Sequence, residues 1–323
     1  MAARAGDAQR RLVAIVGPTG TGKSALAIAL ARRFDGEVVN ADSRQVYVGM
    51  DIGTAKPSPE ERAQVPHHLF DIARPDEPFS LGRWLELARR ALEDIWCRGR
   101  LPLLVGGTGQ YVWALLEGWT VPRVPPRPEL RRLLEERARR EGVDSLYREL
   151  TQRDPQAAAF IDPRNLRRVV RALEVMEATG RPFSEQRQRA GPSVPCLVIG
   201  LWLPRPELYR RTDQRVEEMV RRGLVEEVRR LLAAGYSPGL PAMSSIGYKE
   251  VCQHLQGEIS LAEAVERIKT GTHRLVRHQE NWFRRSDRRI RWLRADDPAL
   301  VERAAALVEE LLRARQEAMP CAS

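Results

Sequence analysis

The feature that most constrains the fold is a glycine-rich loop between an apolar run and a helix-forming run. The loop reads Gly17-Pro18-Thr19-Gly20-Thr21-Gly22-Lys23-Ser24 and fits the P-loop pattern G-x-x-x-x-G-K-[ST]. Residues 12–16 before it are apolar with strand character, and residues 25–31 after it are rich in Ala and Leu, which favour helix. A strand, this loop and a helix in this order predict a parallel α/β fold of the P-loop type.

The loop also predicts a bound diphosphate or triphosphate. Its glycines let backbone N–H groups converge on a phosphate, and the helix N-terminus adds a partial positive charge. We expect Lys23 to reach the terminal phosphate oxygens and the Ser24 hydroxyl to ligate Mg²⁺. The loop alone does not specify which phosphate compound binds or which bond breaks.

Composition narrows the class of protein further. The formal net charge is +10, which suits an anionic partner such as nucleic acid, although solubility alone would explain it equally well. No stretch approaches 18 apolar residues and residues 1–11 lack an apolar core, so neither a membrane span nor a signal peptide is expected. The four cysteines, at positions 97, 196, 252 and 321, form no C-x-x-C pair and fit a reducing cytoplasm.

Strands and helices alternate through the first third of the chain. Residues 37–40 and 100–105 read as strands, and Ser80 is a suitable N-cap for a helix through Trp96. Residues 196–203 read as a late strand that rejoins the sheet. Ligands gather at the carboxyl ends of parallel strands, which places Asp42, just after the second strand, near the phosphate loop. The predicted fold is α/β: a P-loop NTPase-like parallel sheet flanked by helices, with an inserted, mostly helical domain.

The character of the chain changes after Thr120. Residues 121–128 are rich in proline and read as a stiff linker, and residues 129–150 are helical and highly charged. The charge fits an RNA-facing insertion or a solvated helix pair equally well. We expect a P-loop core in residues 1–118, a helical insertion in 119–162, and in 163–323 the rest of the core with a basic helical C-terminal part. The basic segment 274–289, with Trp282 and Phe283, fits nucleic-acid binding or a plain helix face.

Several sequence blocks together resemble the tRNA dimethylallyltransferase family, the bacterial tRNA isopentenyltransferases. Besides the P-loop, the blocks are Asp42-Ser43-x-Gln45-Val46-Tyr47, Asp51-Ile52-Gly53-Thr54-Ala55-Lys56-Pro57, Pro66-His67-His68-Leu69, Gly106-Gly107-Thr108-Gly109-x-Tyr111, Arg171-Ala172-Leu173-Glu174-Val175, Ile246-Gly247-Tyr248-Lys249-Glu250 and Gln279-x-x-Trp282-Phe283-Arg284. They follow the family order from about residue 12 to residue 290. The blocks at 51–57 and 106–111 are highly specific to this family.

The resemblance implies a reaction. The P-loop would bind dimethylallyl diphosphate instead of ATP, and the dimethylallyl group would pass to the N6 amine of a flipped tRNA adenosine, releasing diphosphate. The adenosine would lie 3′ of the anticodon in tRNAs that read codons beginning with U. The implied partners are the tRNA anticodon stem-loop and dimethylallyl diphosphate, with Mg²⁺ as cofactor, no membrane and a monomeric protein.

The resemblance also implies roles for single residues. Asp42 would be the general base, Thr19 would lie near the reacting carbon, and Arg215 would hold the diphosphate. The expected tRNA contacts are Asp42, Ser43, Arg44, Gln45, Thr108, Arg167, Arg168, Arg171, Ser245, Ile246, Gly247, Tyr248 and Lys249. His278 departs from the family pattern, in which Arg usually stands at this position, so its role is open.

Other functions remain compatible with the residues. A small-molecule kinase could use the same loop for ATP and Asp42 for its acceptor, but the strand at 101–105 ends in Gly-Gly-Thr and not in the acidic residue of a Walker B motif. An adenylate prenyltransferase and a non-catalytic RNA-binding protein are further alternatives. Asp42 could instead assist Mg²⁺, and Asp71, His67 and His68 have structural alternatives at a strand end.

Overall fold

The computed structural model describes residues 10–122, 124–186, 191 and 194–314, which form two compact units. Unit 1 comprises residues up to Leu115 and from Val194 onward, and unit 2 comprises Leu116–Ser193. The N-terminal residues 1–9, Arg123 of the expected linker and Cys321 lie outside the described residues. Among the described residues, no helix combines the length and the apolar character needed to span a membrane.

Unit 1 is built on a six-stranded parallel sheet with the order β3-β2-β4-β1-β5-β6. The strands are β1 (Leu12–Val16), β2 (Gly36–Asn40), β3 (His67–His68), β4 (Leu101–Val105), β5 (Cys196–Trp202) and β6 (Ile290–Arg294). Every residue of β1, β2 and β4 is buried, as expected of strands covered on both faces. The predicted P-loop-type α/β fold is thereby confirmed.

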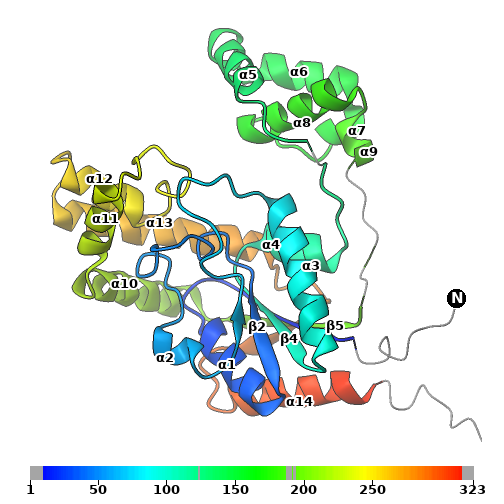
Figure 1. The fold of residues 1–323 in the computed structure, drawn as a ribbon, viewed down its shortest axis with the longest axis vertical. Coiled ribbons are helices and arrows are strands. Elements are labelled where there is room, and N and C mark those ends of the chain that lie inside the picture. The colour runs from blue at the N-terminus through cyan, green and yellow to red at the C-terminus, as the bar shows by residue number, and fades with distance from the viewer. Residues whose placement is uncertain (1–9, 123, 187–190, 192–193, 315–323) are drawn as a thin grey trace, which may run out of the picture. The chain divides into compact units, whose positions relative to one another are not determined.

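Helices cover both faces of this sheet, as Figure 1 shows for α1, α3 and α14. Apolar side chains of α1 and α14 form one core with β1, β2, β4 and β5. On the other face, Trp84 of α3 stacks on Tyr111 of α4 with ring centroids 4.5 Å apart. The helices of unit 1 are α1 (Lys23–Arg33), α2 (Pro59–Arg62), α3 (Leu81–Cys97), α4 (Gly109–Leu116), α10 (Arg205–Arg221), α11 (Leu224–Ala233), α12 (Tyr248–Leu255), α13 (Leu261–Trp282) and α14 (Leu300–Arg313).

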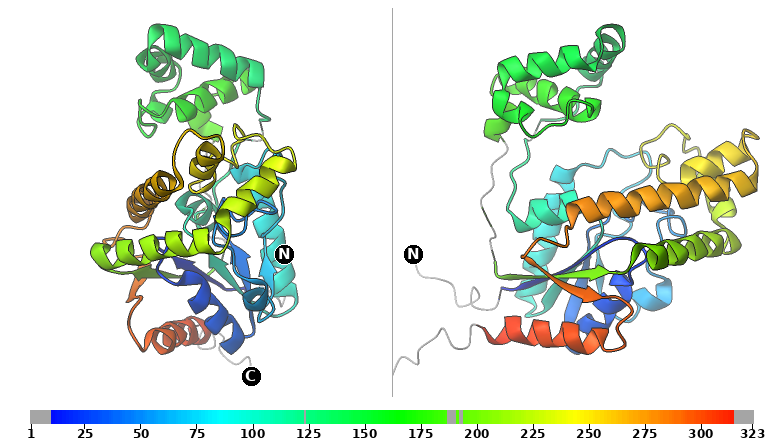
Figure 2. Two further views of the ribbon diagram at one scale, coloured as in Figure 1. Left: turned by 90° about the vertical axis from the view of Figure 1, so that its left-hand side faces the viewer. Right: turned by 180° about the vertical axis from the view of Figure 1, so that it is seen from behind.

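Helices α10 to α13 pack on one another beside the sheet, on the side away from α14 (Figure 2). The chain enters this group from the end of β5 and leaves it at the end of α13. Because β5 pairs in parallel with β1, which leads into the P-loop, α10 begins beside that loop.

The helix that we expected after Ser80 is α3, and the Ser80 hydroxyl accepts the N–H of Arg83 at 3.2 Å. Strand β6 was not predicted, because the C-terminal part of the chain was expected to be helical and charged residues interrupt the apolar pattern of the strand.

Unit 2 is a helical unit with its own core. Its helices are α5 (Pro128–Glu141), α6 (Val143–Arg153), α7 (Pro155–Ala158), α8 (Leu166–Thr179) and α9 (Phe183–Gln186). The expected insertion ended at residue 162, but α8 belongs to this unit because Val169, Val170 and Leu173 pack against the apolar faces of α5 and α6. The segment 129–150 is helical, as expected, and consists of two helices separated at Gly142, whose φ of 85° ends α5.

Candidate active site at the carboxyl edge of the sheet

The P-loop connects the end of β1 to the start of α1. Gly17 lies so close to β5 that a Cβ atom there would be 2.4 Å from the Leu201 carbonyl oxygen, so only glycine fits. Gly22 has a φ of 79° and precedes the first residue of α1, Lys23. The Thr21 hydroxyl donates to the Pro18 carbonyl at 2.8 Å and fixes the turn. The loop therefore exposes a helix N-terminus that a phosphate can approach.

A cavity of about 360 Å³ lies above this loop in unit 1, and several charged groups line it. Lys23, Asp42 and Arg215 all line it, together with Thr19 and Ser24. Removal of the Lys23 amine from water lowers its pKa to about 8; the Asp42 carboxylate opposes this shift and Arg215 adds to it. In the described structure the amine donates to the Pro18 carbonyl at 2.7 Å. The cavity thus holds an ammonium that an anion would stabilise.

Arg215 lies on α10 and reaches the P-loop, where it donates to the Thr19 hydroxyl at 3.4 Å. The alternative partner on its own helix, Glu218, pairs instead with Arg221. Arg211, one turn earlier, also lines the cavity but is paired with Glu207 at 2.9 Å. Helix α10 therefore brings the Arg215 side chain to the phosphate loop.

Asp42 is held in a turn after β2. The buried Asn40 side chain accepts the N–H of Asp42 at 2.9 Å and donates to its carbonyl at 3.2 Å. The Asp42 Oδ1 atom accepts the N–H of Arg44 at 2.8 Å, and its other oxygen has no hydrogen-bond donor within the described part of the chain. Thr108, beyond β4, accepts the N–H of Ser43 at 3.0 Å and so braces the same turn. A carboxylate fixed at one oxygen and open at the other suits proton transfer.

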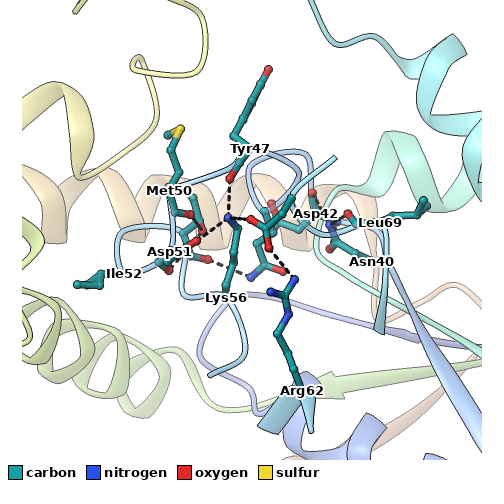
Figure 3. A network of polar contacts seen from close by, with 12 residues as sticks. Asn40, Asp42, Tyr47, Met50, Asp51, Ile52, Lys56, Arg62 and Leu69 are labelled. Atoms are coloured by element: carbon teal, nitrogen blue, oxygen red, sulfur yellow. Dashed lines mark hydrogen bonds and ion pairs between the residues drawn. The ribbon is translucent and has the colours of Figure 1, made fainter. Parts of the chain in front are cut away.

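The loop that follows is closed around the buried amine of Lys56 (Figure 3). Lys56 donates to the Tyr47 carbonyl at 2.5 Å and pairs with Asp51 at 2.7 Å and Asp71 at 2.5 Å. Its side chain is 2% exposed. Asp71 also pairs with Arg62 at 2.8 Å, which favours the structural alternative for this residue. These bonds close the chain from residue 47 to residue 71 around the cavity.

A second buried charge fixes the middle of this loop. Glu227 on α11 is 2% exposed and accepts the backbone N–H groups of Asp51, Ile52 and Gly53 at 2.8–3.2 Å. The Tyr248 hydroxyl donates to the same carboxylate at 2.6 Å. A Cβ atom on Gly53 would lie 2.5 Å from the Tyr248 ring, which explains the glycine. Gln45 completes the closure by donating to the carbonyls of Thr54 and Ala55 at 3.0 Å.

The chain matches known proteins over most of its length. The model of the IPP transferase family matches residues 45–286, and the isopentenyl transferase model matches residues 10–70. The chain is 54% identical over 303 residues to the tRNA dimethylallyltransferase of Roseiflexus sp. (strain RS-1), covering 94% of this chain and 99% of that relative. It is 57% identical over 274 residues to the tRNA dimethylallyltransferase of Chloroflexus aurantiacus (strain ATCC 29366 / DSM 635 / J-10-fl), covering 85% and 93%.

Solved structures are similar over nearly the whole chain. The full-length tRNA isopentenylpyrophosphate transferase of Bacillus halodurans superimposes with a TM-score of 0.72 at 38% identity, covering 96% of this chain and 99% of that one. A eukaryotic dimethylallyltransferase acting on tRNA superimposes with a TM-score of 0.80 at 29% identity, covering 97% and 81%. The chain belongs to the IPP transferase family.

Two further parts of this IPP transferase carry predicted tRNA contacts. In residues 245–249, Lys249 is exposed and Ile246 is half-buried, but Ser245 and Tyr248 are buried and Gly247 donates its N–H to Glu250 at 2.8 Å. The Tyr248 side chain therefore supports the loop at 51–53 from inside. In unit 2, Arg167 and Arg168 are exposed, whereas Arg171 donates to the Glu174 carboxylate at 2.5 Å and to the Val124 carbonyl at 2.9 Å.

The two neighbouring histidines of the IPP transferase have different surroundings. His68 contacts the buried Glu37 carboxylate at 2.6 Å, away from the P-loop. His67 lines the cavity; burial lowers its pKa, and its Nδ1 atom lies 2.8 Å from the Val65 carbonyl. The contacts favour a packing role for both, which was the structural alternative.

Sequence reasoning missed the roles of Gln279 and Glu227. Gln279 lines the cavity although it lies 260 residues after Thr19, and Glu227 was not singled out at all. Gln279 opens a recognisable block, but nothing local in that block indicates what it contacts.

The aromatic residues of the same block pack against other parts of the protein. Phe283 is 1% exposed, and Trp282 packs over Gly109, where a Cβ atom would lie 2.3 Å from the ring. These contacts favour a packing role over base stacking for both residues.

Proposed function

We propose that this protein is a tRNA dimethylallyltransferase that uses dimethylallyl diphosphate as donor and a tRNA adenosine N6 amine as acceptor. The supporting observation is the cavity that joins the P-loop, Arg215 and the open oxygen of Asp42. Its lining also includes the apolar side chains of Val38, Phe70 and Val105 beside the polar groups. A diphosphate with a short hydrocarbon chain matches a cavity of this mixed character.

The P-loop would bind the diphosphate. Backbone N–H groups at the start of α1, the Lys23 ammonium and the Arg215 guanidinium are the groups aimed at it. Negative charge develops on the diphosphate as its bond to the allylic carbon breaks, and fixed cations stabilise that charge. Thr19, which accepts a hydrogen bond from Arg215, would lie next to the reacting carbon.

The acceptor would be an adenosine flipped from the tRNA. Its N6 nitrogen forms the new bond to the allylic carbon, the carbon–oxygen bond to diphosphate breaks, and Asp42 takes the proton from nitrogen. Such base assistance is typically worth about 10²–10⁴-fold. The turn that carries Ser43, Arg44 and Gln45 would surround the base together with Thr108. Flipping costs little in a loop that is already single-stranded.

Magnesium fits the donor set of this cavity. Among the described residues, no group of three His, Cys, Asp or Glu side chains could hold a metal alone. The Ser24 hydroxyl would therefore share the ion with diphosphate oxygens and water, as Mg²⁺ prefers. When bound, Mg²⁺ would shield charge on the leaving diphosphate.

The test is incubation of the protein with unmodified tRNA and labelled dimethylallyl diphosphate, followed by mass spectrometry of the tRNA nucleosides. We expect N6-dimethylallyladenosine in tRNA, and we expect Asp42→Ala to abolish turnover while tRNA binding survives. Label moving from ATP to a small metabolite would replace this proposal with a kinase. A preference for AMP over tRNA as acceptor would indicate an adenylate prenyltransferase.

A further inference from the structure

Gln279 connects two loops whose relative position matters for the proposed reaction. It lies in the last turns of α13, and only 4% of it is exposed. Its Oε1 atom accepts the backbone N–H of Thr19 in the P-loop at 2.8 Å. Its Nε2 atom donates to the Gly107 carbonyl, beyond the end of β4, at 3.2 Å. One buried amide therefore connects loops from two different strands.

The loop at Gly107 carries the connection on to the acceptor side. The next residue, Thr108, donates its N–H to the Ala41 carbonyl at 3.2 Å and accepts the N–H of Ser43 at 3.0 Å. Ser43 is adjacent to Asp42. The path from the diphosphate loop to the proposed base therefore runs through the Gln279 amide, Gly107 and Thr108.

The Gln279 amide packs directly against Gly107. A Cβ atom on Gly107 would lie 2.1 Å from Nε2 of Gln279. The φ of Gly107 is outside the left-handed region, so its backbone alone would accept a side chain. The same end of α13 is anchored a second time, because Trp113 donates its indole N–H to the Trp282 carbonyl at 3.1 Å. The helix end is thus rigidly seated on residues 106–113.

We infer that Gln279 is a positioning residue: it sets the distance between the diphosphate held by the P-loop and the adenine amine held beside Asp42. The inference rests on the proposed function. The Thr19 N–H that Gln279 occupies is unavailable to phosphate, so the amide acts through the loops and not on the leaving group. Misplacing reacting groups by about 1 Å can cost about 10²-fold in rate without changing the binding of either substrate.

The test replaces Gln279 by Met, which keeps most of the volume and removes both hydrogen bonds, and by Ala. We expect kcat for dimethylallyl transfer to fall about 30–100-fold, with KM for tRNA and for dimethylallyl diphosphate within about threefold of wild type. Gln253→Ala is the matched control, because Gln253 on α12 contacts only Glu258 among the hydrogen bonds described. Its kcat should stay within about twofold of wild type.

Gly107→Ala completes a double-mutant cycle. Alone it should lower kcat as Gln279→Ala does, since its new methyl group displaces the amide. In the Gln279→Ala background the space is open, so the second change should cost less than about threefold. Losses that multiply would overturn the inference, and so would a Gln279→Met variant that keeps kcat or changes only KM. A wild-type protein that forms no N6-dimethylallyladenosine would refute the proposed function instead, before any variant is compared.

Discussion

Glu174 in unit 2 and Lys23 in unit 1 are both charges removed from water, but their surroundings compensate for this to different degrees. Burial alone would raise the pKa of Glu174, but hydrogen bonds from Arg131, the Arg127 backbone and Arg171 outweigh it and lower the pKa to about 2. For Lys23, burial itself is the largest influence and lowers the pKa to about 8. The charged form is thus favoured at Glu174 and disfavoured at Lys23.

The difference separates a structural charge from a binding charge. The donors to Glu174 all belong to unit 2, so its negative charge is balanced without a ligand. The Lys23 amine donates to the Pro18 carbonyl, and Asp42 only partly offsets the effects of burial and of the Arg215 guanidinium on its pKa. An anionic ligand would stabilise the charged amine further. Perturbed groups in a cavity are expected where ligands bind. Stability and ligand binding should therefore respond in opposite directions at the two positions.

The largest expected effect comes from Lys23→Met. Transfer activity should fall about 10²–10³-fold, because one cation that stabilises the leaving diphosphate is lost. The free energy of unfolding should rise by about 1–3 kcal/mol, because an apolar side chain replaces a desolvated amine. Enzyme assays and urea denaturation measure the two quantities.

Lys269→Met is the matched control for that variant. Lys269 pairs with Glu217 and Glu266 near the surface, so its loss should lower stability slightly. If Lys23→Met destabilises the protein as much as the control does, Lys23 is a satisfied structural charge and the contrast with Glu174 is wrong.

The next largest effect is on the pH dependence of donor binding. The free protein loses the Lys23 proton near pH 8, whereas a bound diphosphate should keep the amine charged. The Kd for dimethylallyl diphosphate, measured without tRNA, should therefore rise about tenfold per pH unit between about pH 8 and 10. Lys23→Met should abolish this slope, and a slope that persists in the variant would assign it to another group.

Glu174→Ala should affect stability without affecting donor binding. The free energy of unfolding should fall by about 2–3 kcal/mol, because the buried carboxylate organises two arginines and a backbone N–H. In the wild type the same contribution should be present above pH 4.5 and be lost as the pH falls toward 2, since the folded-state pKa lies below the unfolded value. Denaturation curves between pH 5 and 2.5 measure it, and the Ala variant should lack this part of the acid sensitivity.

These two charges also show what the sequence could predict. The strand, glycine loop and helix at residues 12–31 are local, and so is the cap at Ser80; each was predicted and each is present. Most donors to Glu174 and Glu227 are distant in the chain: Arg127 and Arg131 lie 47 and 43 positions from Glu174, and the N–H groups of residues 51–53 lie 174–176 positions from Glu227. Neither set of hydrogen bonds was predicted. Strand β6 lies at the sheet edge, where only Ile290 is fully buried, and its pattern IRWLR carries little apolar signal. Long-range contacts and edge positions are where local patterns stop being informative.

The smallest expected effect separates two arginines on one helix. Arg171 is occupied by Glu174 and the Val124 carbonyl, whereas Arg168 is exposed at the start of α8. Arg171→Ala should lower the free energy of unfolding by about 1 kcal/mol, because Glu174 keeps Arg131. Arg168→Ala should leave stability unchanged, weaken tRNA binding and reduce the slope of log affinity against log salt by about 1. Unfolding curves and salt-dependent tRNA binding compare the two variants directly. A larger loss of tRNA affinity in Arg171→Ala than in Arg168→Ala would mean that Arg171 leaves Glu174 when RNA binds. The ion pairs inside unit 2 would then serve RNA binding as well as stability.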